Sequence, residues 1–356
     1  MNDQKTILLD LRNLNNPTSG FGQIARNYAH LFGSLNEPDL RFVFLIPENF
    51  SEDIFGQAKV VRYTKEMRRD SRLLPKVDLW HSVNQQQKVR RIDDGTKFVL
   101  TIHDLNYLTE KNWLRQMKHN LRLGRMIRHA DAVTAISGYV AKQVESNFAH
   151  KLEGKPVATI YDAVESISNK TSTKPTFASG RPFFFTIGQI RMKKNFHLLV
   201  DVMKAFPDHD LYICGDDHFE AAKVIRKKIK EGNVNNVRLC GKISEGEKIW
   251  LYSNCEAFLF PSQGEGFGLP VIEAMQFGKP VLVSPHTCLP EISGGHAFVW
   301  SDVHTSTMVD GIKNYLPEFY SDKDKSQKVR DYGHSFTYER HVSQYLALYR
   351  NVLNLG

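Results

Sequence analysis

The sequence lacks any hydrophobic run that could cross a membrane. None of its apolar stretches approaches the roughly 20 residues that a transmembrane helix requires. The opening segment, Met1 to Lys5, is mostly polar and does not begin a signal peptide. There is also no tandem repeat. We therefore expect a cytoplasmic protein without a secretory leader or a membrane-spanning segment.

Cysteine is scarce, and its spacing excludes two further classes of protein. The four cysteines are Cys214, Cys240, Cys255 and Cys288, and no two of them form a C-x-x-C pair. A disulfide framework and a cysteine-based zinc site are both disfavoured by this pattern. We expect buried free thiols.

The bulk composition is that of a globular protein with a basic surface. Hydrophobic residues make up 41% of the chain and charged residues 24%, and a length of 356 residues favours two domains. The net charge of +8 favours anionic partners, whether phosphates, nucleic acid or an anionic membrane.

Short apolar runs alternate with helix-like segments along the whole chain. Such runs, without polar alternation, are typical of parallel strands buried on both faces of a sheet. The expected strands include 7–10, 42–45, 98–102, 132–136, 183–187, 211–214, 237–239, 257–260 and 281–283. Alternation with helices predicts doubly wound α/β domains.

A Ser-, Thr- and Lys-rich stretch near the middle of the chain has no hydrophobic period and is typical of a linker. We place the linker at residues 166–180. It separates an N-terminal domain at 1–165 from a C-terminal domain at 181–335. Residues 336–356 form an amphipathic C-terminal helix.

Two carboxylates in the second half of the chain are separated by seven residues. Glu265 and Glu273 enclose Gly266 and Gly268, which allow close backbone approach, and Pro270, which suits the first turn of a helix. Glu265 therefore lies in the loop before a helix, and Glu273 leans back toward that loop. A helix start favours phosphate, and carboxylates bind sugar hydroxyls. A nucleotide sugar combines both groups.

The 265–273 segment resembles the E-x7-E signature of retaining glycosyltransferases with the GT-B fold, family 4 in particular. The strand at 257–260 and the segments 280–284 and 289–292 also match that family, and the resemblance covers most of the chain. It implies two Rossmann-like doubly wound domains facing across a cleft. The N-terminal domain would hold the acceptor and the C-terminal domain the nucleotide sugar, and the final helix would cross back to the N-terminal domain.

The family resemblance also implies roles for individual residues. Lys194 matches the lysine that binds the donor diphosphate, Glu265 would hold the donor sugar and Glu273 the ribose. With His103, which would face the transferred sugar, Lys194 and Glu265 form the expected catalytic set. The expected donor-binding set is Gly20, Gly22, Lys193, Lys194, Glu265, Gly266, Phe267, Gly268, Leu269 and Glu273. Arg191 would add a further cation near the diphosphate.

Gly20, Gly22 and Ala25 also satisfy the dinucleotide fingerprint G-x-G-x-x-A. That fingerprint requires the glycines directly after the first strand, and here about ten residues intervene. An NAD-dependent oxidoreductase is therefore a weaker alternative. The family has a similar loop at the start of its first helix.

Acidic pairs are present at Asp208–Asp210, Asp216–Asp217 and Asp322–Asp324, and solvated turns account for the first and last of them. Lysines and a helix start can neutralise a leaving diphosphate without a cation. We therefore expect no metal and no other cofactor.

Cationic residues recur at helical spacing in the first half of the chain, at Lys111, Arg115, Lys118, Arg122 and Arg125. No acidic residue lies between Lys111 and Arg128. This stripe is either a solvated face or a contact with anionic lipid or with an acidic acceptor. It predicts peripheral association with the inner face of a membrane. No nucleic-acid motif accompanies it, so we expect no nucleic-acid partner.

The combined prediction is a metal-independent retaining hexosyltransferase. It would use a UDP- or GDP-sugar donor and a glycan or lipid-linked acceptor, in bacterial lipopolysaccharide, O-antigen or capsule assembly. A sugar-nucleotide epimerase or phosphorylase of the same fold and a non-catalytic binding protein are the alternatives.

Overall fold

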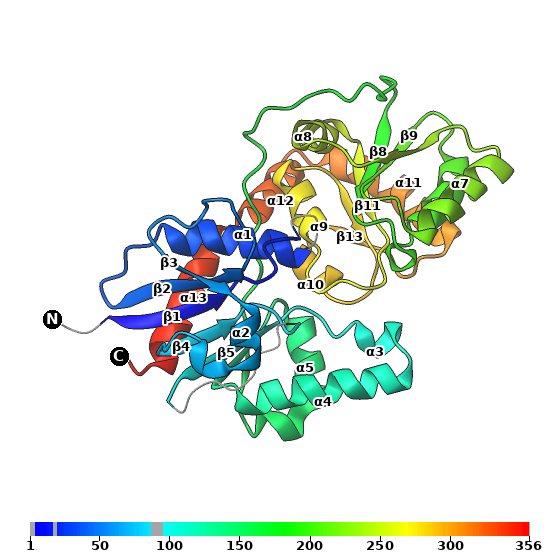
Figure 1. Ribbon diagram of the computed structural model, residues 1–356. Helices are drawn as coiled ribbons and strands as arrows, with labels where there is room; N and C mark the ends of the chain where they lie inside the picture. The colour runs from blue at the N-terminus through cyan, green and yellow to red at the C-terminus, as the bar shows by residue number, and fades with distance from the viewer. Residues whose placement is uncertain (1–3, 17–19, 87–94, 356) are drawn as a thin grey trace. The chain divides into compact units, whose positions relative to one another are not determined.

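The computed structural model describes residues 4–16, 20–86 and 95–355. These residues form two compact units (Figure 1). The first unit takes the described residues up to Tyr161 together with those from Tyr338 onward, and the second unit is Asp162–Thr337. Each unit contains one parallel β-sheet covered by helices.

The sheet of the first unit has the strand order β3-β2-β1-β4-β5-β6-β7, and its pairings are parallel. The strands are β1 Lys5–Asp10, β2 Leu40–Pro47, β3 Lys59–Tyr63, β4 Leu79–Ser82, β5 Lys97–Ile102, β6 Ala132–Ala135 and β7 Val157–Thr159. The order reverses between β1 and β4, which is the topological switch point of a doubly wound sheet.

Helices cover both faces of this sheet, as the continuous apolar strands predict. Ile7 and Leu9 point into one buried core, and Leu8 between them points into the other. The helices are α1 Gly20–Gly33, α2 Lys65–Arg69, α3 Tyr107–Glu110, α4 Trp113–His129, α5 Gly138–Leu152 and α13 Tyr338–Val352. Residues of α1 and α13 pack in the first core, and residues of α4 and α5 pack in the second.

The final helix α13, red in Figure 1, is held in the first unit by buried hydrogen bonds. His81 Nδ1 lies 2.7 Å from the Tyr349 hydroxyl, and Thr101 Oγ1 lies 2.8 Å from the Tyr345 hydroxyl. Burial lowers the pKa of His81 to about 3, so this histidine is neutral in the folded protein. The end of the chain is thus part of the first core.

The second sheet repeats the topology of the first, with the order β10-β9-β8-β11-β12-β13. Its strands are β8 Phe183–Ile187, β9 Asp210–Cys214, β10 Val237–Gly241, β11 Ala257–Phe260, β12 Val281–Val283 and β13 Phe298–Val299. The helices of the second unit are α6 Phe196–Val202, α7 Glu220–Glu231, α8 Glu245–Asn254, α9 Leu269–Gln276, α10 Leu289–Ser293, α11 Thr305–Ser321 and α12 Lys325–His334. The 3₁₀ turns are η1 Ser71–Leu73 in the first unit, and η2 Met192–Lys194 and η3 Met203–Ala205 in the second. The predicted doubly wound α/β fold is confirmed.

The stretch that we placed as a linker, 166–180, is packed against the second unit instead of lying between two domains. The Ile167 amide donates to the side chain of Gln276 at 3.2 Å, and the Thr173 amide donates to the Gly246 carbonyl at 3.0 Å. The segment has no helix or strand, which explains its polar, aperiodic sequence. The chain passes from one unit to the other earlier, at Tyr161 and Asp162.

All four cysteines are free thiols, and three of them are buried. Within the part of the chain that the structure describes, no helix combines the length and the apolar character needed to cross a bilayer.

Candidate functional site

The predicted donor-binding loops of the second unit follow the two strands that flank its switch point. Strands β8 and β11 are neighbours, and the strand order reverses between them. The loop after β8 carries Lys193 and Lys194, and the loop after β11 carries Glu265 to Gly268. Ligands of open α/β sheets bind beyond the carboxyl ends of the strands at this point, so the topology itself brings the two predicted segments together.

Hydrogen bonds fix these two loops to each other. The Gln263 amide donates to the Lys193 carbonyl at 2.7 Å, and the Asn195 side chain donates to the Pro261 carbonyl at 3.0 Å. Asn195 is buried and has a φ of 56°, a left-handed conformation that asparagine tolerates better than most residues. The turn that carries Lys193 and Lys194 is therefore set rigidly against the loop after β11.

Lys194 and Glu265, two of the residues predicted to be catalytic, contact each other directly. The Lys194 ammonium donates to the Glu265 carboxylate, and each side chain is less than 15% exposed, at 13% and 12%. The ammonium also lies over the ring of Phe260, 5.2 Å from its centre. A largely desolvated lysine held by one carboxylate keeps two further N–H donors, which suit an oxygen-rich anion.

The start of α9 is built by glycine and proline, as the sequence predicts. Gly268 is the N-cap residue with a φ of 99°, and Pro270 stands in the first turn. Phe267 is buried and packs edge-on against Phe336, with ring centres 5.8 Å apart. Its side chain therefore anchors the loop.

The thiol of Cys288 also holds this loop in place. Its sulfur lies 3.2 Å from the carbonyl of Phe267, and burial together with the charge of Glu265 raises the pKa of the thiol well above its usual value. Cys288 is therefore a neutral hydrogen-bond donor and not a nucleophile.

Glu273 is held by two residues that we did not predict. Lys248 donates to one carboxylate oxygen at 3.0 Å, and the Tyr252 hydroxyl donates to the other at 2.9 Å. Burial and the charge of Glu273 raise the pKa of Tyr252 well above its usual value, so its hydroxyl stays protonated. Lys248 and Tyr252 both lie on α8, four residues apart and therefore on one face of the helix. That spacing was the only feature of the sequence that could have indicated that they act together.

We expect Tyr252→Phe to raise the KM for the donor about 5-fold with little change in kcat. The substitution removes one hydrogen bond to Glu273, worth roughly 1 kcal/mol, and leaves the ring in place. Steady-state kinetics with varied donor measure the effect, and Tyr320→Phe, a partly exposed tyrosine that bonds the Glu256 carbonyl, is the matched control. An unchanged KM would mean that Tyr252 does not position Glu273.

His103 lies in the first unit, directly after β5, where the sequence placed it. It is buried, and its Nε2 lies 2.8 Å from the Val83 carbonyl. A carbonyl only accepts, so Nε2 carries a proton. The Gln85 side chain accepts from the His103 amide at 3.0 Å, and Phe21 contacts the ring edge-on at 5.0 Å. The ring is thus held in one orientation.

Gly20 and Gly22 open helix α1, where the family resemblance placed them, and they flank Phe21, whose ring contacts His103. A Cβ at Gly22 would come within 1.8 Å of the Asn16 carbonyl oxygen, whereas a Cβ at Gly20 would meet nothing within 4 Å. Gly22 therefore has a packing reason to be glycine, the close approach of α1 to the preceding loop. Of the apparent dinucleotide fingerprint, this contact accounts for the second glycine alone.

The side chains of the other charged candidates contact residues outside the Lys194–Glu265 pair. Arg191 stacks on Phe219 at 4.3 Å and donates to Gln189 at 3.1 Å. Asp210 is paired with Arg181 at 3.1 Å, and Asp322 accepts the Asp324 amide at 2.9 Å. Across 4–16, 20–86 and 95–355, no three His, Cys, Asp or Glu side chains are grouped to hold a metal ion.

Comparison with known families bears directly on this site. Residues 168–336, nearly the whole second unit, match the family described as glycosyl transferases group 1. The match covers just under half of the chain, and all of it lies in the second unit. The E-x7-E segment, the Lys194 turn and the Lys248 helix all lie inside the matched residues.

Individual relatives and structures resemble the chain at low sequence identity. The chain is 24% identical to the serotype-specific mannosyltransferase WbdA of Escherichia coli over 62% of its own length and 30% of WbdA. It is 23% identical to the O-antigen chain mannosyltransferase RfbU of Salmonella typhimurium over 62% of both chains. Each match therefore spans less than two thirds of the relative.

The fold has close counterparts among solved structures. HepE of Anabaena, solved in complex with UDP-glucose, superposes with a TM-score of 0.73 at 15% identity, over 98% of this chain and all of that one. The predicted GT-B fold, with two Rossmann-like domains, is thereby confirmed.

Proposed function

We propose that this protein is a glycosyltransferase that moves a hexose from a nucleotide-sugar donor to a glycan or lipid-linked acceptor. The observation that carries the proposal is the Lys194–Glu265 pair at the switch point of the unit that matches the group 1 family. One cation for the diphosphate and carboxylates for the sugar and ribose hydroxyls are the groups that a nucleotide sugar requires.

The proposed reaction retains the anomeric configuration. The bond between the anomeric carbon and the β-phosphate oxygen breaks, and the acceptor oxygen forms a bond to that carbon from the same face. The acceptor proton passes to the leaving phosphate. Lys194 neutralises the charge that develops on the diphosphate, which is the role that a metal ion has in other transferases, and so we propose metal independence.

The proposed setting is the assembly of a bacterial surface polysaccharide. Support comes from the named relatives, of which one acts on O-antigen chains and another is serotype-specific. The proposed donor is a UDP- or GDP-sugar, and a structural neighbour holds UDP-glucose.

Donor binding tests the proposal through Glu273→Ala. A thermal-shift panel would contain UDP-, GDP- and ADP-sugars. We expect one UDP- or GDP-sugar to raise the melting temperature of the wild type. We expect Glu273→Ala to bind that donor about 30-fold more weakly. Loss of a charge-assisted hydrogen bond to a ribose hydroxyl, worth roughly 2 kcal/mol, accounts for this change. Glu231→Ala, an exposed glutamate of α7, is the matched control.

The turnover assay separates the alternatives. With donor alone and with added polysaccharide precursors, product analysis distinguishes transfer from epimerisation and phosphorolysis. Wild-type rates of donor hydrolysis and of transfer in Glu273→Ala would contradict the site assignment. A stabilising shift with NAD alone, and with none of the nucleotide sugars, would overturn the proposed function in favour of an oxidoreductase.

A further inference from the structure

Helix α4 exposes an unusual amount of apolar surface. Of the eight large hydrophobic residues that stand out as exposed in the described chain, four lie on α4: Trp113 (68%), Leu114 (54%), Met117 (50%) and Leu121 (59%). At 100° per residue they fall within one 100° sector of the helix, opposite the side that packs into the core through Leu123, Met126 and Ile127. We call these four residues the α4 ridge.

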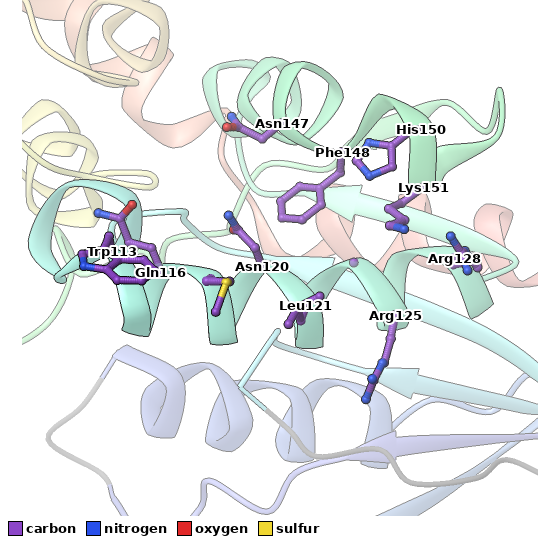
Figure 2. Close-up of a pocket in the computed structure, with 12 residues that line it drawn as sticks. Trp113, Gln116, Asn120, Leu121, Arg125, Arg128, Asn147, Phe148, His150 and Lys151 are labelled. Carbon is purple, nitrogen blue, oxygen red and sulfur yellow. The ribbon is translucent and has the colours of Figure 1, made fainter.

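The α4 ridge borders a hollow between α4 and α5. Its volume is about 520 Å³, and Trp113, Met117 and Leu121 line it together with Phe148 of α5. Figure 2 shows these side chains with the cationic ones that share the lining, Arg125 and Arg128 from α4 and Lys151 from α5. The hollow is therefore apolar toward the start of α4 and cationic toward its end.

The charge of α4 is entirely positive. Residues 113–129 contain five Lys and Arg and no Asp or Glu, which gives 5 − 0 = +5 of the net charge of +8 of the whole chain. The structure corrects the predicted stripe. Lys111 precedes the helix and lies 2.8 Å from His119, and Arg122 turns inward to the Gln85 carbonyl at 3.2 Å.

The cationic residues that stay at the surface lie beside the α4 ridge. Arg115, Lys118, Arg125 and Arg128 are exposed, and Arg128 is 3.6 Å from Glu153. On the helix wheel, Lys118 and Arg125 fall next to Leu114 at the margin of the ridge. Apolar and cationic groups therefore share one outward surface, which a merely solvated cationic helix does not require.

We propose that α4 docks on an anionic lipid bilayer. The α4 ridge enters the boundary between headgroups and acyl chains, where tryptophan is favoured, and Lys118 and Arg125 pair with lipid phosphates. Lys151, which lines the hollow, contacts a further headgroup there. Charge complementarity selects this occupant, because a helix with an apolar ridge, cationic margins and no acidic residue of its own matches the boundary layer of an anionic membrane. The proposal adds a partner to the proposed glycosyltransferase but does not depend on its activity.

Sedimentation with vesicles tests the proposal in the absence of any donor. The full chain is expected to bind vesicles of phosphatidylglycerol and phosphatidylcholine, and to bind pure phosphatidylcholine poorly. Trp113→Ser with Leu121→Ser should weaken binding about 10-fold, since two exposed apolar side chains no longer insert. Lys118→Glu with Arg125→Glu should weaken it about 25-fold at low salt.

Two matched controls lie in the same unit. Leu73→Ser changes an equally exposed leucine (52%) outside α4, and Lys142→Glu reverses an exposed charge on α5 that does not line the hollow. Both are expected to bind vesicles like the wild type. Because all the altered positions are at the surface, we expect the melting temperatures to be unchanged. Measuring them will show that each variant folds.

Fluorescence gives a second readout. Trp80 and Trp300 are buried and Trp250 is half-buried, so the exposed Trp113 will report on the membrane. A blue shift of the tryptophan emission on adding anionic vesicles supports insertion of α4. This shift should be absent in Trp113→Phe, although that variant should still sediment with the vesicles. No sedimentation of the wild type would overturn the proposal, and so would binding that both α4 double variants retain. A donor-induced thermal shift that persists in these cases would leave the proposed function standing.

Discussion

Replacing Lys194 with alanine is expected to lower kcat for sugar transfer by about 10²- to 10³-fold. Its ammonium is largely desolvated, contacts Glu265 and lies on a turn fixed by the Gln263–Lys193 hydrogen bond. A preorganised cation of this kind stabilises charge on the leaving diphosphate without reorganisation during the reaction, and loss of one such group typically costs this much. Steady-state kinetics with saturating donor and acceptor measure it.

The design must separate this chemical role from the stability of the loop. Lys194→Ala leaves the largely buried Glu265 carboxylate without its cation, which lowers stability. The double variant Lys194→Ala with Glu265→Gln removes that unpaired charge. If the unpaired charge is the cause of the lower stability, the melting temperature of the double variant returns to that of the wild type. Lys204→Ala is the matched control, because Lys204 pairs with Asp201 at 2.8 Å but is 52% exposed. A kcat within twofold of the wild type in a folded Lys194→Ala protein would remove Lys194 from the mechanism.

Local sequence was enough to predict the elements that carry this site. The apolar runs 183–187 and 257–260 became β8 and β11, and Gly268 with Pro270 set the start of α9. These features depend on neighbours in the chain and on the rule that parallel strands share one carboxyl edge. The position of Lys194 next to Glu265 followed from that rule once the two strands were placed side by side.

The partners of Glu273 could not be predicted in the same way. Lys248 and Tyr252 lie 25 and 21 residues before it, on another helix, and only packing of α8 against α9 brings them together. The outward direction of the α4 ridge was equally hidden, because helical spacing fixes which residues share a face but not which face is buried. The carbonyl that fills the space beside Gly22 is a further tertiary fact, and no local pattern marks it.

The largest expected effect on stability is that of Gly215→Ala. Gly215 follows β9, where its amide donates to the Gly241 carbonyl at 2.8 Å, and the neighbouring Ile190 amide donates to the Asp216 carbonyl at 2.9 Å. The loops after β8 and β9 are thereby laid directly against each other. A Cβ at Gly215 would come within 1.9 Å of the Gly188 carbonyl oxygen, and the φ of 121° already disfavours any residue with a side chain.

Overpacking and backbone strain add at this position. Each is worth roughly 1–3 kcal/mol, so we expect a loss of about 4 kcal/mol of unfolding free energy and a melting temperature lower by roughly 10 °C. Relief of the clash would move the loop that begins at Gly188 and carries Lys194, so donor binding should weaken in the protein that still folds. Calorimetry and donor titration of the same sample measure both.

Gly180→Ala separates the two contributions to that loss. Gly180 has a positive φ of 92°, but a Cβ there would meet no atom within 4 Å. Only backbone strain remains, and we expect a loss of about 1–2 kcal/mol with donor affinity unchanged. Equal losses of stability in the two variants would show that the contact with Gly188 is relieved without cost. In that case the close approach of the loops after β8 and β9 would not fix the position of the Lys194 turn.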